Sequence, residues 1–252
     1  MIEPYYETEL GKLYHGDCLS VMPELEPVDL VWTSPPYNLG KPRKGSMFNL
    51  ADGSGTSRFP TLEYDQHNDA LPDKEYEKWQ HSVLLVCRSM LKNTGAIFYN
   101  HKPRIQNGIL DNRRRLIPFP IRQEIVWDRG SDFNFCGAFF VPTTERIFIY
   151  ANPDWRPTRK HIAWGEVWKI VPRRNSDLKH PAQFPEALAE RVLMGGSCVG
   201  EIVLDPFFGA GTTGVAAEKL SRRWIGIEIS EEYCEIAAER IESETRQRKL
   251  FT

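Results

Sequence analysis

The sequence "TSPPYN" (residues 33–38) contains the residue types with the clearest chemical potential. It follows the apolar run "VDLVW", which is typical of a buried strand. Proline fixes φ, lacks a backbone donor and pushes the residue before it into an extended conformation. Ser34, Pro35, Pro36 and Tyr37 therefore form a rigid elbow that holds a hydroxyl oxygen, a free carbonyl and an aromatic ring in fixed relative positions. A Pro-Pro pair alone indicates only a strand-ending turn, but functional residues of open α/β sheets gather where strands end.

A second stretch, "EIVLDPFFGAGTTG" (residues 201–214), predicts a strand, a glycine-rich turn and the start of a helix. Gly209, Gly211 and Gly214 satisfy the pattern G-x-G-x-x-G, and Glu228 closes the next strand, so dinucleotide binding is one interpretation. Residues 205–208 place an acid, a proline and two aromatic rings before the glycines, where a dinucleotide fold usually turns at once. The motifs "HGDC" (residues 15–18) and "TSPPYN" would also stay unexplained by that interpretation.

Strands and helices alternate along the chain, and this alternation predicts the scaffold that positions these residues. Seven apolar runs, most of them continuous as in strands covered on both faces, are "KLYHG", "VDLVW", "GAIFYN", "RQEIVW", "ERIFIYA", "EIVLD" and "RWIGIEI". We expect Asp73 to cap a helix, Pro185 to begin one, and Ser230 to cap the C-terminal one. The pattern predicts an α/β fold with a doubly wound, mostly parallel sheet.

Composition narrows the class of protein. The chain has 252 residues, which fits one large α/β domain, and its 41% hydrophobic and 26% charged residues are ordinary for a globular protein. No run approaches about 18 apolar residues, so no membrane partner is expected. Five scattered cysteines without a Cys-x-x-Cys pair argue for a reducing, intracellular setting and against a metal site.

Charge is unevenly distributed along the chain. The net charge is −2, yet residues 101–179 contain 15 Lys and Arg against eight Asp and Glu, a local charge of +7. Such a concentration can bind a polyanion, although a basic stretch is more often a solvated face.

Together, "TSPPY", "DPFFGAGTTG" and "KHPAQFPEAL" resemble the S-adenosylmethionine-dependent DNA amino-methyltransferases, which methylate N6 of adenine or N4 of cytosine. The resemblance covers most of the chain, and the order of the motifs is that of the permuted β group. It implies a seven-stranded, Rossmann-like sheet with one antiparallel strand near the edge, for which "ERIFIYA" is the candidate. It also implies a single domain, residues 1–252, with a variable DNA-proximal loop at 40–71 and a target-recognition insertion at 152–179.

The resemblance implies S-adenosylmethionine as the cofactor and assigns residues to it. Glu228 would accept hydrogen bonds from both ribose hydroxyls, and Asp17 would meet the adenine amino group. For Asp205 a cap on the following turn and a direct cofactor contact are equally compatible with the sequence. The full expected set is Asp17, Cys18, His180, Asp205, Phe207, Phe208, Gly209, Gly211, Thr212, Thr213 and Glu228, with Pro181 following His180 in a segment that closes over the methionine end.

The resemblance gives the elbow a catalytic role. An exocyclic amino group is a poor nucleophile because its lone pair is delocalised into the ring. Ser34 Oγ and the Pro35 carbonyl could accept its two hydrogens at non-coplanar positions, while Tyr37 stacks on the flipped base. Serine in place of the aspartate common in adenine enzymes, and "HPAQFP" in place of "HPTQKP", favour N4 of cytosine, with N6 of adenine as the alternative.

Double-stranded DNA is the expected partner. Its contacts are assigned to Lys41, Arg43, Lys44, Arg156, Arg159, Lys160, Arg173 and Arg174. Trp155, Trp164 and Trp168 could add stacking, although for Trp164 and Trp168 a small satellite core is the favoured interpretation. The resemblance also allows a homodimer, a cognate restriction endonuclease and a cytoplasmic, prokaryotic or phage-encoded origin.

Three other functions are alternatives. Amino-methyltransferases of RNA or protein glutamine carry "NPPY" and place the glycine motif before the elbow, opposite to the order in this chain. A nicotinamide dehydrogenase would leave the elbow unexplained. A non-enzymatic DNA-binding relative would be expected to have lost one of the two motifs, and both are intact.

Overall fold

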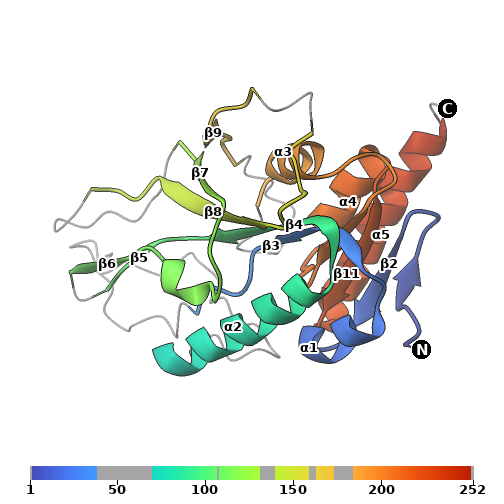
Figure 1. Cartoon of the computed structure of the whole chain (residues 1–252). Helices are drawn as coiled ribbons and strands as arrows, with labels where there is room; N and C mark the ends of the chain where they lie inside the picture. Colours follow the sequence, from blue (N-terminus) through green and yellow to red (C-terminus); the bar gives the residue numbers. More distant parts are fainter. Residues whose placement is uncertain are drawn as a thin grey trace, which may run out of the picture.

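One large sheet with helices on both faces organises the molecule (Figure 1). The computed structural model describes residues 2–38, 70–106, 108–130, 140–158, 163–172 and 184–250. The predicted loop at 40–71 lies almost entirely outside these residues, and so does much of the predicted insertion at 152–179.

The main sheet has nine strands among the described residues, in the order β1-β2-β11-β10-β3-β4-β8-β7-β9. In that order they are β1 (Tyr6–Glu7), β2 (Gly11–His15), β11 (Arg223–Glu228), β10 (Ile202–Asp205), β3 (Val28–Thr33), β4 (Leu91–His101), β8 (Thr144–Ala151), β7 (Gln123–Asp128) and β9 (Val167–Lys169). The five strands from β2 to β4 are parallel, whereas β8 runs antiparallel to both β4 and β7. The doubly wound, mostly parallel sheet is therefore confirmed.

The strand count differs slightly from the predicted seven. All seven apolar runs form strands, and "ERIFIYA" is confirmed as the reversed strand β8, but β1 is a second reversed strand, since it pairs antiparallel with β2. The additional strands are β1, which has two residues, and β9, which has three. Segments this short carry no periodicity that a sequence pattern can show.

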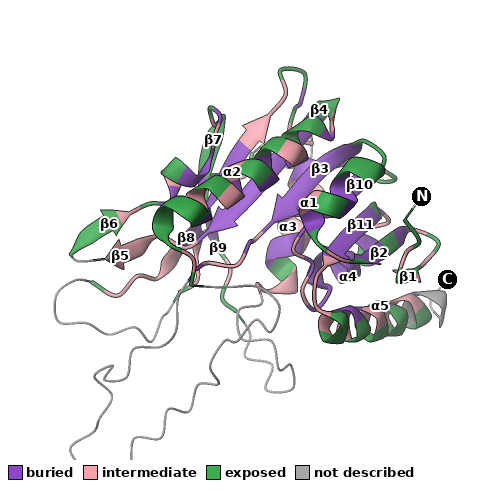
Figure 2. Cartoon of the chain, turned by 90° about the horizontal axis from the view of Figure 1, so that it is seen from below, coloured by how far each residue is buried: buried purple, intermediate pink, exposed green. Residues whose placement is uncertain are grey.

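Helices cover the two faces of the sheet and create two separate cores (Figures 1 and 2). One face carries α1 (Cys18–Val21) and α2 (Asp73–Ser89), and the other carries α3 (Glu186–Gly196), α4 (Thr212–Lys219) and α5 (Glu231–Leu250). Every residue of β3 and of β10 is buried. Successive side chains of β3 enter opposite cores, because Leu30 and Trp32 pack on the α3 side and Val31 packs on the α2 side. This double burial explains why these strands read as continuous apolar runs.

Smaller elements extend this frame beyond the end of β4. They are a hairpin of β5 (Arg104–Gln106) and β6 (Ile109–Asp111) and the 3₁₀ turn η2 (Arg114–Leu116), whereas a second 3₁₀ turn, η1 (Met22–Glu24), directly follows α1. Arg104 Nη1 donates to the Asn38 carbonyl at 3.0 Å and so ties the hairpin to the chain that leaves the elbow.

The predicted helix starts are right to within one residue. The N-cap of α2 is Pro72, and Asp73 is the first helical residue without a side-chain cap bond, so the predicted capping role of Asp73 is wrong. Pro185 is the N-cap of α3. Ser230 Oγ accepts from the Tyr233 backbone N–H at 3.5 Å, as a cap of α5 would. Within the described ranges, no helix combines the length and apolar character needed to cross a membrane.

Candidate active site

Four neighbouring parallel strands end at the same edge of the sheet and bring the sequence motifs together. In spatial order β2, β11, β10 and β3 lead into Asp17, Glu228, the glycine turn and Ser34. The contacts between these strand ends are direct, since Gly16 N–H donates to the Glu228 carbonyl at 2.9 Å and Phe208 N–H donates to the Ile227 carbonyl at 2.9 Å. The motifs are far apart in the sequence, but topology makes them neighbours.

The elbow leaves β3 with trans peptide bonds throughout. Ser34 is half-buried, and its Oγ lies 3.0 Å from the Tyr37 hydroxyl. Asn38, which follows, adopts a left-handed φ of 55°. Its side-chain amide pairs with both backbone groups of Leu71, at 2.8 Å each. The segment is thus fixed at both ends, by the sheet before Ser34 and by this pair of hydrogen bonds after Tyr37.

A buried polar cluster lies behind the elbow. Asn100 Nδ2, at the end of β4, donates to the Tyr37 hydroxyl at 2.8 Å, to Glu145 Oε2 at 3.0 Å and to Ser34 Oγ at 3.3 Å. The Tyr37 hydroxyl donates to Glu145 Oε2 at 2.9 Å. Arg129 Nη1 lies 3.4 Å from Glu145 Oε1 and supplies the counter-charge. Sequence reasoning missed Asn100, Glu145 and Arg129.

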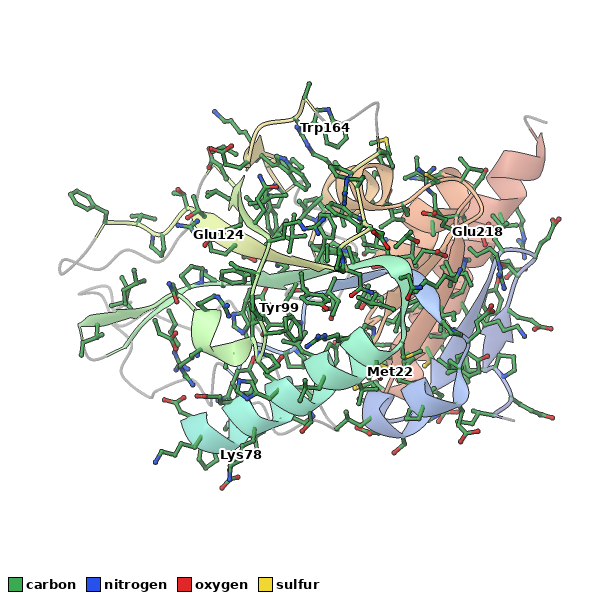
Figure 3. All side chains as sticks on the ribbon, viewed as in Figure 1. Met22, Lys78, Tyr99, Glu124, Trp164 and Glu218 are labelled. Atoms are coloured by element: carbon green, nitrogen blue, oxygen red, sulfur yellow. The ribbon has the colours of Figure 1, made fainter. Side chains whose placement is uncertain are left out.

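A second buried group of aromatic and polar residues supports the elbow from the α2 side. The Tyr76 hydroxyl donates to the Pro36 carbonyl at 2.7 Å and lies 2.9 Å from His101 Nε2. The His101 ring stacks on Tyr37, with centroids 4.6 Å apart. Burial lowers the pKa of His101 to about 3, with the nearby Arg113 charge as a further cause, so the imidazole is neutral. Tyr99, visible between the sheet and α2 in Figure 3, completes the group through Gln80.

The glycine turn is held closed by Glu228. Its Oε2 accepts from Gly209 N–H at 2.7 Å and its Oε1 from Ser230 N–H at 2.9 Å, and burial raises the pKa of this carboxyl. Gly209 has a φ of 51° and Gly211 a φ of 79°, both in the left-handed region where glycine is favoured. A Cβ at Gly211 would lie 2.9 Å from the Ala237 Cβ, so the close contact between the turn and α5 requires glycine at this position.

Asp205 stabilises the turn from inside. It is 1% exposed, its Oδ1 accepts from Phe207 N–H at 3.1 Å, and its Oδ2 accepts from Thr213 Oγ1 at 2.5 Å. Burial raises its pKa to about 7, and these two hydrogen bonds only partly oppose that shift. The structure thus places Asp205 in the capping role, which was one of the two roles that the sequence left open.

The remaining predicted cofactor residues differ in exposure. Asp17 is exposed and caps α1, accepting from Ser20 N–H at 3.1 Å. Phe208 is 3% exposed and stacks on Trp224 inside the core, and the Cys18 thiol is also buried, so only their backbones can face a ligand. Phe207 is half-buried against Trp79. Thr212 and Thr213 begin α4 and are buried, and His180 and Pro181 lie outside the described residues.

Most of the predicted DNA contacts also lie outside the described residues, namely Lys41, Arg43, Lys44, Arg159, Lys160, Arg173 and Arg174. Arg156 is exposed, and its Nη1 donates to the Pro153 and Trp155 carbonyls at 2.6 and 2.7 Å. The tryptophans belong to the core, since Trp155 and Trp168 are buried and Trp164 packs edge-on against Trp168. Trp164 and Trp168 pack in a core, as favoured, but this core is the large α3-side cluster and not a small satellite, and the burial of Trp155 excludes its stacking on DNA.

Several arginines of the basic span have structural partners. Arg113 is buried and pairs with Asp111, Arg115 pairs with Glu77, and Arg129 and Arg146 pair with Glu145 and Glu124. Asp111, Glu124 and Glu145 lie within the span and are already subtracted in the charge of +7, so among these pairs only Arg115 with Glu77 lowers the net positive charge further.

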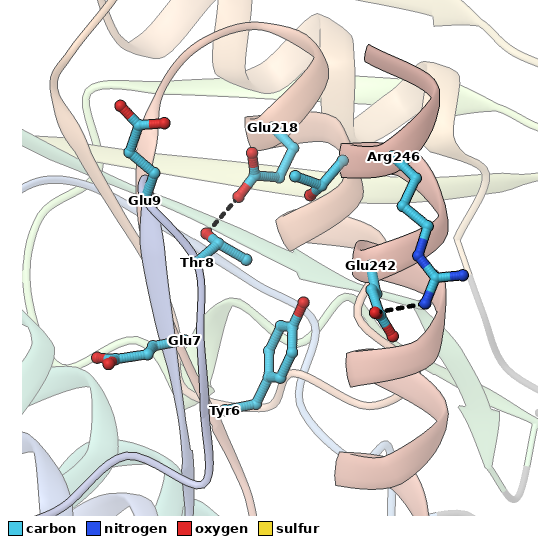
Figure 4. Close-up of a pocket in the computed structure, with 8 residues that line it drawn as sticks. Tyr6, Glu7, Thr8, Glu9, Glu218, Glu242 and Arg246 are labelled. Carbon is cyan, nitrogen blue, oxygen red and sulfur yellow. Dashed lines mark hydrogen bonds and ion pairs between the residues drawn. The ribbon is translucent and has the colours of Figure 1, made fainter. Parts of the chain in front are cut away.

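A hollow of about 390 Å³ lies away from the strand ends, between β1, α4 and α5 (Figure 4). Glu218 lies at its buried wall and accepts from Thr8 Oγ1 at 2.5 Å and from Trp224 Nε1 at 2.9 Å. These residues lie where β2 and β11 begin, at the edge of the sheet opposite to the elbow. The hollow is therefore separate from the candidate active site.

Known proteins share both the sequence pattern and this architecture. A family model described as DNA methylase, of the N6/N4 methyltransferase type, matches residues 28–239. The chain is 29% identical to the Type II methyltransferase M.BglII of Bacillus subtilis, over 96% of this chain and 72% of that protein. It is also 29% identical to M.BamHI of Bacillus amyloliquefaciens, over 99% of this chain and 61% of that protein.

Solved structures show the same fold. The PvuII DNA methyltransferase, titled cytosine-N4-specific, superposes with a TM-score of 0.74 at 22% identity, covering 97% of this chain and 93% of that one. M1.HpyAVI in complex with S-adenosylmethionine superposes with a TM-score of 0.62 at 20% identity, covering 92% of this chain and 99% of that one. The chain belongs to the N6/N4 DNA methylase family, whose members are S-adenosylmethionine-dependent DNA methyltransferases.

The residues at the strand ends fit S-adenosylmethionine chemically. The left-handed backbone at Gly209 has no side chain that would keep a ligand away from the turn. Glu228 has about four lone-pair sites, and its backbone donors are Gly209, Ser230 and Ile229, so acceptor capacity for a ribose hydroxyl remains. Asp17 adds an exposed carboxylate on the neighbouring strand end.

Proposed function

We propose that this enzyme methylates N4 of cytosine in double-stranded DNA at a specific site. The observation that carries the proposal is the neutral hydroxyl of Ser34 in the first position of the elbow, beside the strand end that bears the glycine turn. The cytosine-like "HPAQFP" segment and the cytosine-N4 specificity in the name of the PvuII enzyme support the same base.

The elbow has two acceptors for the hydrogens of the base amino group. Ser34 Oγ is one of them. The other is the Pro35 carbonyl, which accepts no hydrogen bond from any residue that the structure describes, whereas the Pro36 carbonyl is engaged by Tyr76. Two acceptors in non-coplanar directions draw the amino nitrogen toward a tetrahedral, nucleophilic geometry. When bound, S-adenosylmethionine supplies an electrophilic methyl group on a positively charged sulfur.

The flipped base is proposed to stack on Tyr37. One face of this ring already stacks on His101, which fixes the ring plane at the mouth of the elbow. Base–aromatic stacking contributes about 1–3 kcal/mol, which offsets much of the few kcal/mol needed to extrude a nucleotide.

Nucleoside analysis by mass spectrometry tests the choice of base. DNA methylated by the purified enzyme should yield N4-methylcytosine after digestion. N6-methyladenine would replace the cytosine assignment with the adenine one, and the absence of any methylated base would contradict the proposed function.

A variant pair tests the elbow itself. Ser34→Ala removes one positioned acceptor and should lower the single-turnover rate by roughly 10²–10³-fold while cofactor and DNA still bind. Ser82→Ala is the matched control, because Ser82 is an exposed serine on α2 whose hydroxyl only donates to the Lys78 carbonyl. A wild-type rate for Ser34→Ala would mean that the elbow is only a turn.

We further propose that DNA is contacted by the basic residues of 40–71 and 152–179, and that Asp17, His180 and the glycine turn hold the cofactor. Each phosphate contact adds about 0.9 to the slope of log affinity against log salt, so replacing Arg173 and Arg174 with alanine should flatten that slope. An unchanged slope would show that these residues are only solvated.

The wider setting is also proposed. Both curated relatives are named Type II methyltransferases, which supports a cognate restriction endonuclease and a cytoplasmic, prokaryotic or phage-encoded enzyme. A homodimer is part of the same proposal, and light scattering of the purified chain would test it.

A further inference from the structure

The hydrogen bonds behind the elbow have only one consistent direction. The Tyr37 hydroxyl has a single hydrogen, and it is donated to Glu145 Oε2 at 2.9 Å, because a carboxylate can only accept. The 3.0 Å contact between Ser34 and Tyr37 must then use the hydrogen of Ser34. The order is therefore Ser34 O–H to Tyr37 O–H to the Glu145 carboxylate.

Asn100 is compatible with this direction, because its Nδ2 only donates. Its two hydrogens are shared among the Tyr37 hydroxyl, Glu145 Oε2 and Ser34 Oγ, at 2.8, 3.0 and 3.3 Å. A Ser34 hydroxyl that donates one hydrogen and accepts one from Asn100 keeps one further lone pair. That lone pair is the acceptor that the elbow needs for a hydrogen of the base amino group.

The burial of the Glu145 carboxylate is unusual for a residue whose only role is to stabilise the sheet. Glu145 is 5% exposed and Asn100 is fully buried, and Asn100 Oδ1 has no hydrogen-bond partner among the residues that the structure describes. Burying a carboxylate costs several kcal/mol even when a guanidinium such as that of Arg129 pairs with it. An apolar pair at the same positions would pack the sheet without these costs, so a gain in stability does not explain the cluster.

We propose that Glu145 is the terminal proton acceptor of methyl transfer, reached from the base through Ser34 and Tyr37. This proposal rests on the proposed function, because it requires that an amino group is methylated at the elbow. As the N–CH₃ bond forms, the S–CH₃ bond breaks and its electron pair stays on sulfur. One amino proton passes to Ser34 Oγ, the Ser34 proton passes to the Tyr37 oxygen, and the Tyr37 proton passes to Glu145. Sulfonium becomes thioether, amine becomes methylamine, and the proton on Glu145 is later released to solvent.

Glu145→Gln is the first test, because the amide oxygen can still accept a hydrogen bond but cannot take up the proton. The single-turnover rate should fall by about 10²-fold, the usual contribution of a positioned general base, with unchanged affinities for DNA and cofactor. The residual rate should rise with pH more steeply than the wild-type rate, because hydroxide then replaces the carboxylate as base. A purely structural defect would leave the shape of the pH profile unchanged.

Tyr37→Phe is the second test, because it keeps the ring that stacks on His101 and removes only the hydroxyl that relays the proton. If both residues act in one chain, the double variant should be no slower than the slower single variant, whereas independent effects would multiply. If Glu145→Gln also lowers the Tm, the rate and the pH profile of Tyr37→Phe decide whether the proton passes along this chain.

Glu124→Gln is the matched control, because Glu124 lies on the neighbouring strand β7 in a surface ion pair with Arg146. It should turn over at the wild-type rate. A wild-type rate for Glu145→Gln, a pH profile parallel to that of the wild type, or multiplying effects in the double variant would overturn the proposal. Those results would leave the proposed function intact, which fails only if the wild-type enzyme methylates no base.

Discussion

Replacing Asp205 with asparagine should make the protein more stable, and increasingly so as the pH rises. Burial raises the pKa of Asp205 from its usual 3.8 to about 7. Between these values the folded chain holds a proton that the unfolded chain has lost, so the stability of the wild type falls as the pH rises through this window. A shift of about three units at about 1.4 kcal/mol each amounts to about 4 kcal/mol in total. Asparagine keeps an acceptor for the Phe207 N–H and does not titrate.

Urea unfolding of the wild type and of Asp205→Asn at a series of pH values measures this effect. The stability difference in favour of the variant should grow by about 3 kcal/mol between pH 5 and pH 8. Over this range Asp205 is already deprotonated in the unfolded wild type, and it loses its proton in the folded wild type only near pH 7. Asp154→Asn, at an exposed aspartate, is the control and should give a difference that does not change with pH. Parallel stability curves for Asp205→Asn and the wild type would refute the argument, because they would show that Asp205 is ionised in the folded protein.

Three further predictions concern the frame of the site. Burial holds the pKa of His101 at about 3, so below about pH 6.5 the unfolded chain binds a proton at His101 that the folded chain does not bind. The stability of the wild type should therefore fall as the pH is lowered, and the stability of His101→Gln should fall less steeply. Gly211→Ala should lower stability by about 2–3 kcal/mol in thermal unfolding, because the backbone is left-handed and the new Cβ would meet Ala237. Gly200→Ala, left-handed but in open space, isolates the backbone part at about 1 kcal/mol. Glu228→Gln should weaken cofactor binding in calorimetry by roughly tenfold or more, as expected for the loss of a charged acceptor, and equal affinities would remove Glu228 from the cofactor site.

The sheet could be predicted because its strands are buried on both faces. β3 and β10 are apolar without interruption, and such runs are visible in a single sequence. β1 and β9 were missed because they have only two and three residues, and segments this short form strands only by hydrogen bonding to a neighbouring strand. The error at Asp73 has a similar origin, since Pro72 occupies the N-cap of α2 and the choice between adjacent candidates depends on backbone geometry.

The candidate site was predictable only where the parallel strands end. Ser34, Glu228 and the glycine turn follow strands that run in one direction, so a search for polar residues after apolar runs finds them. Glu145 escapes that search because β8 is reversed, which places the beginning of β8 at the edge where its neighbours end. Asn100 escapes it for another reason, since it lies inside β4 and reads as part of a strand.

The two prolines of the elbow have carbonyls with different partners. The Pro36 carbonyl accepts from the Tyr76 hydroxyl at 2.7 Å, and the Tyr76 hydroxyl accepts from Gln80 Nε2 at 3.1 Å, so this carbonyl anchors the elbow to α2. The Pro35 carbonyl has no such partner among the described residues. Under the proposed function, the Pro35 carbonyl would accept a hydrogen of the base, so one rigid segment would be anchored through Pro36 and would act through Pro35.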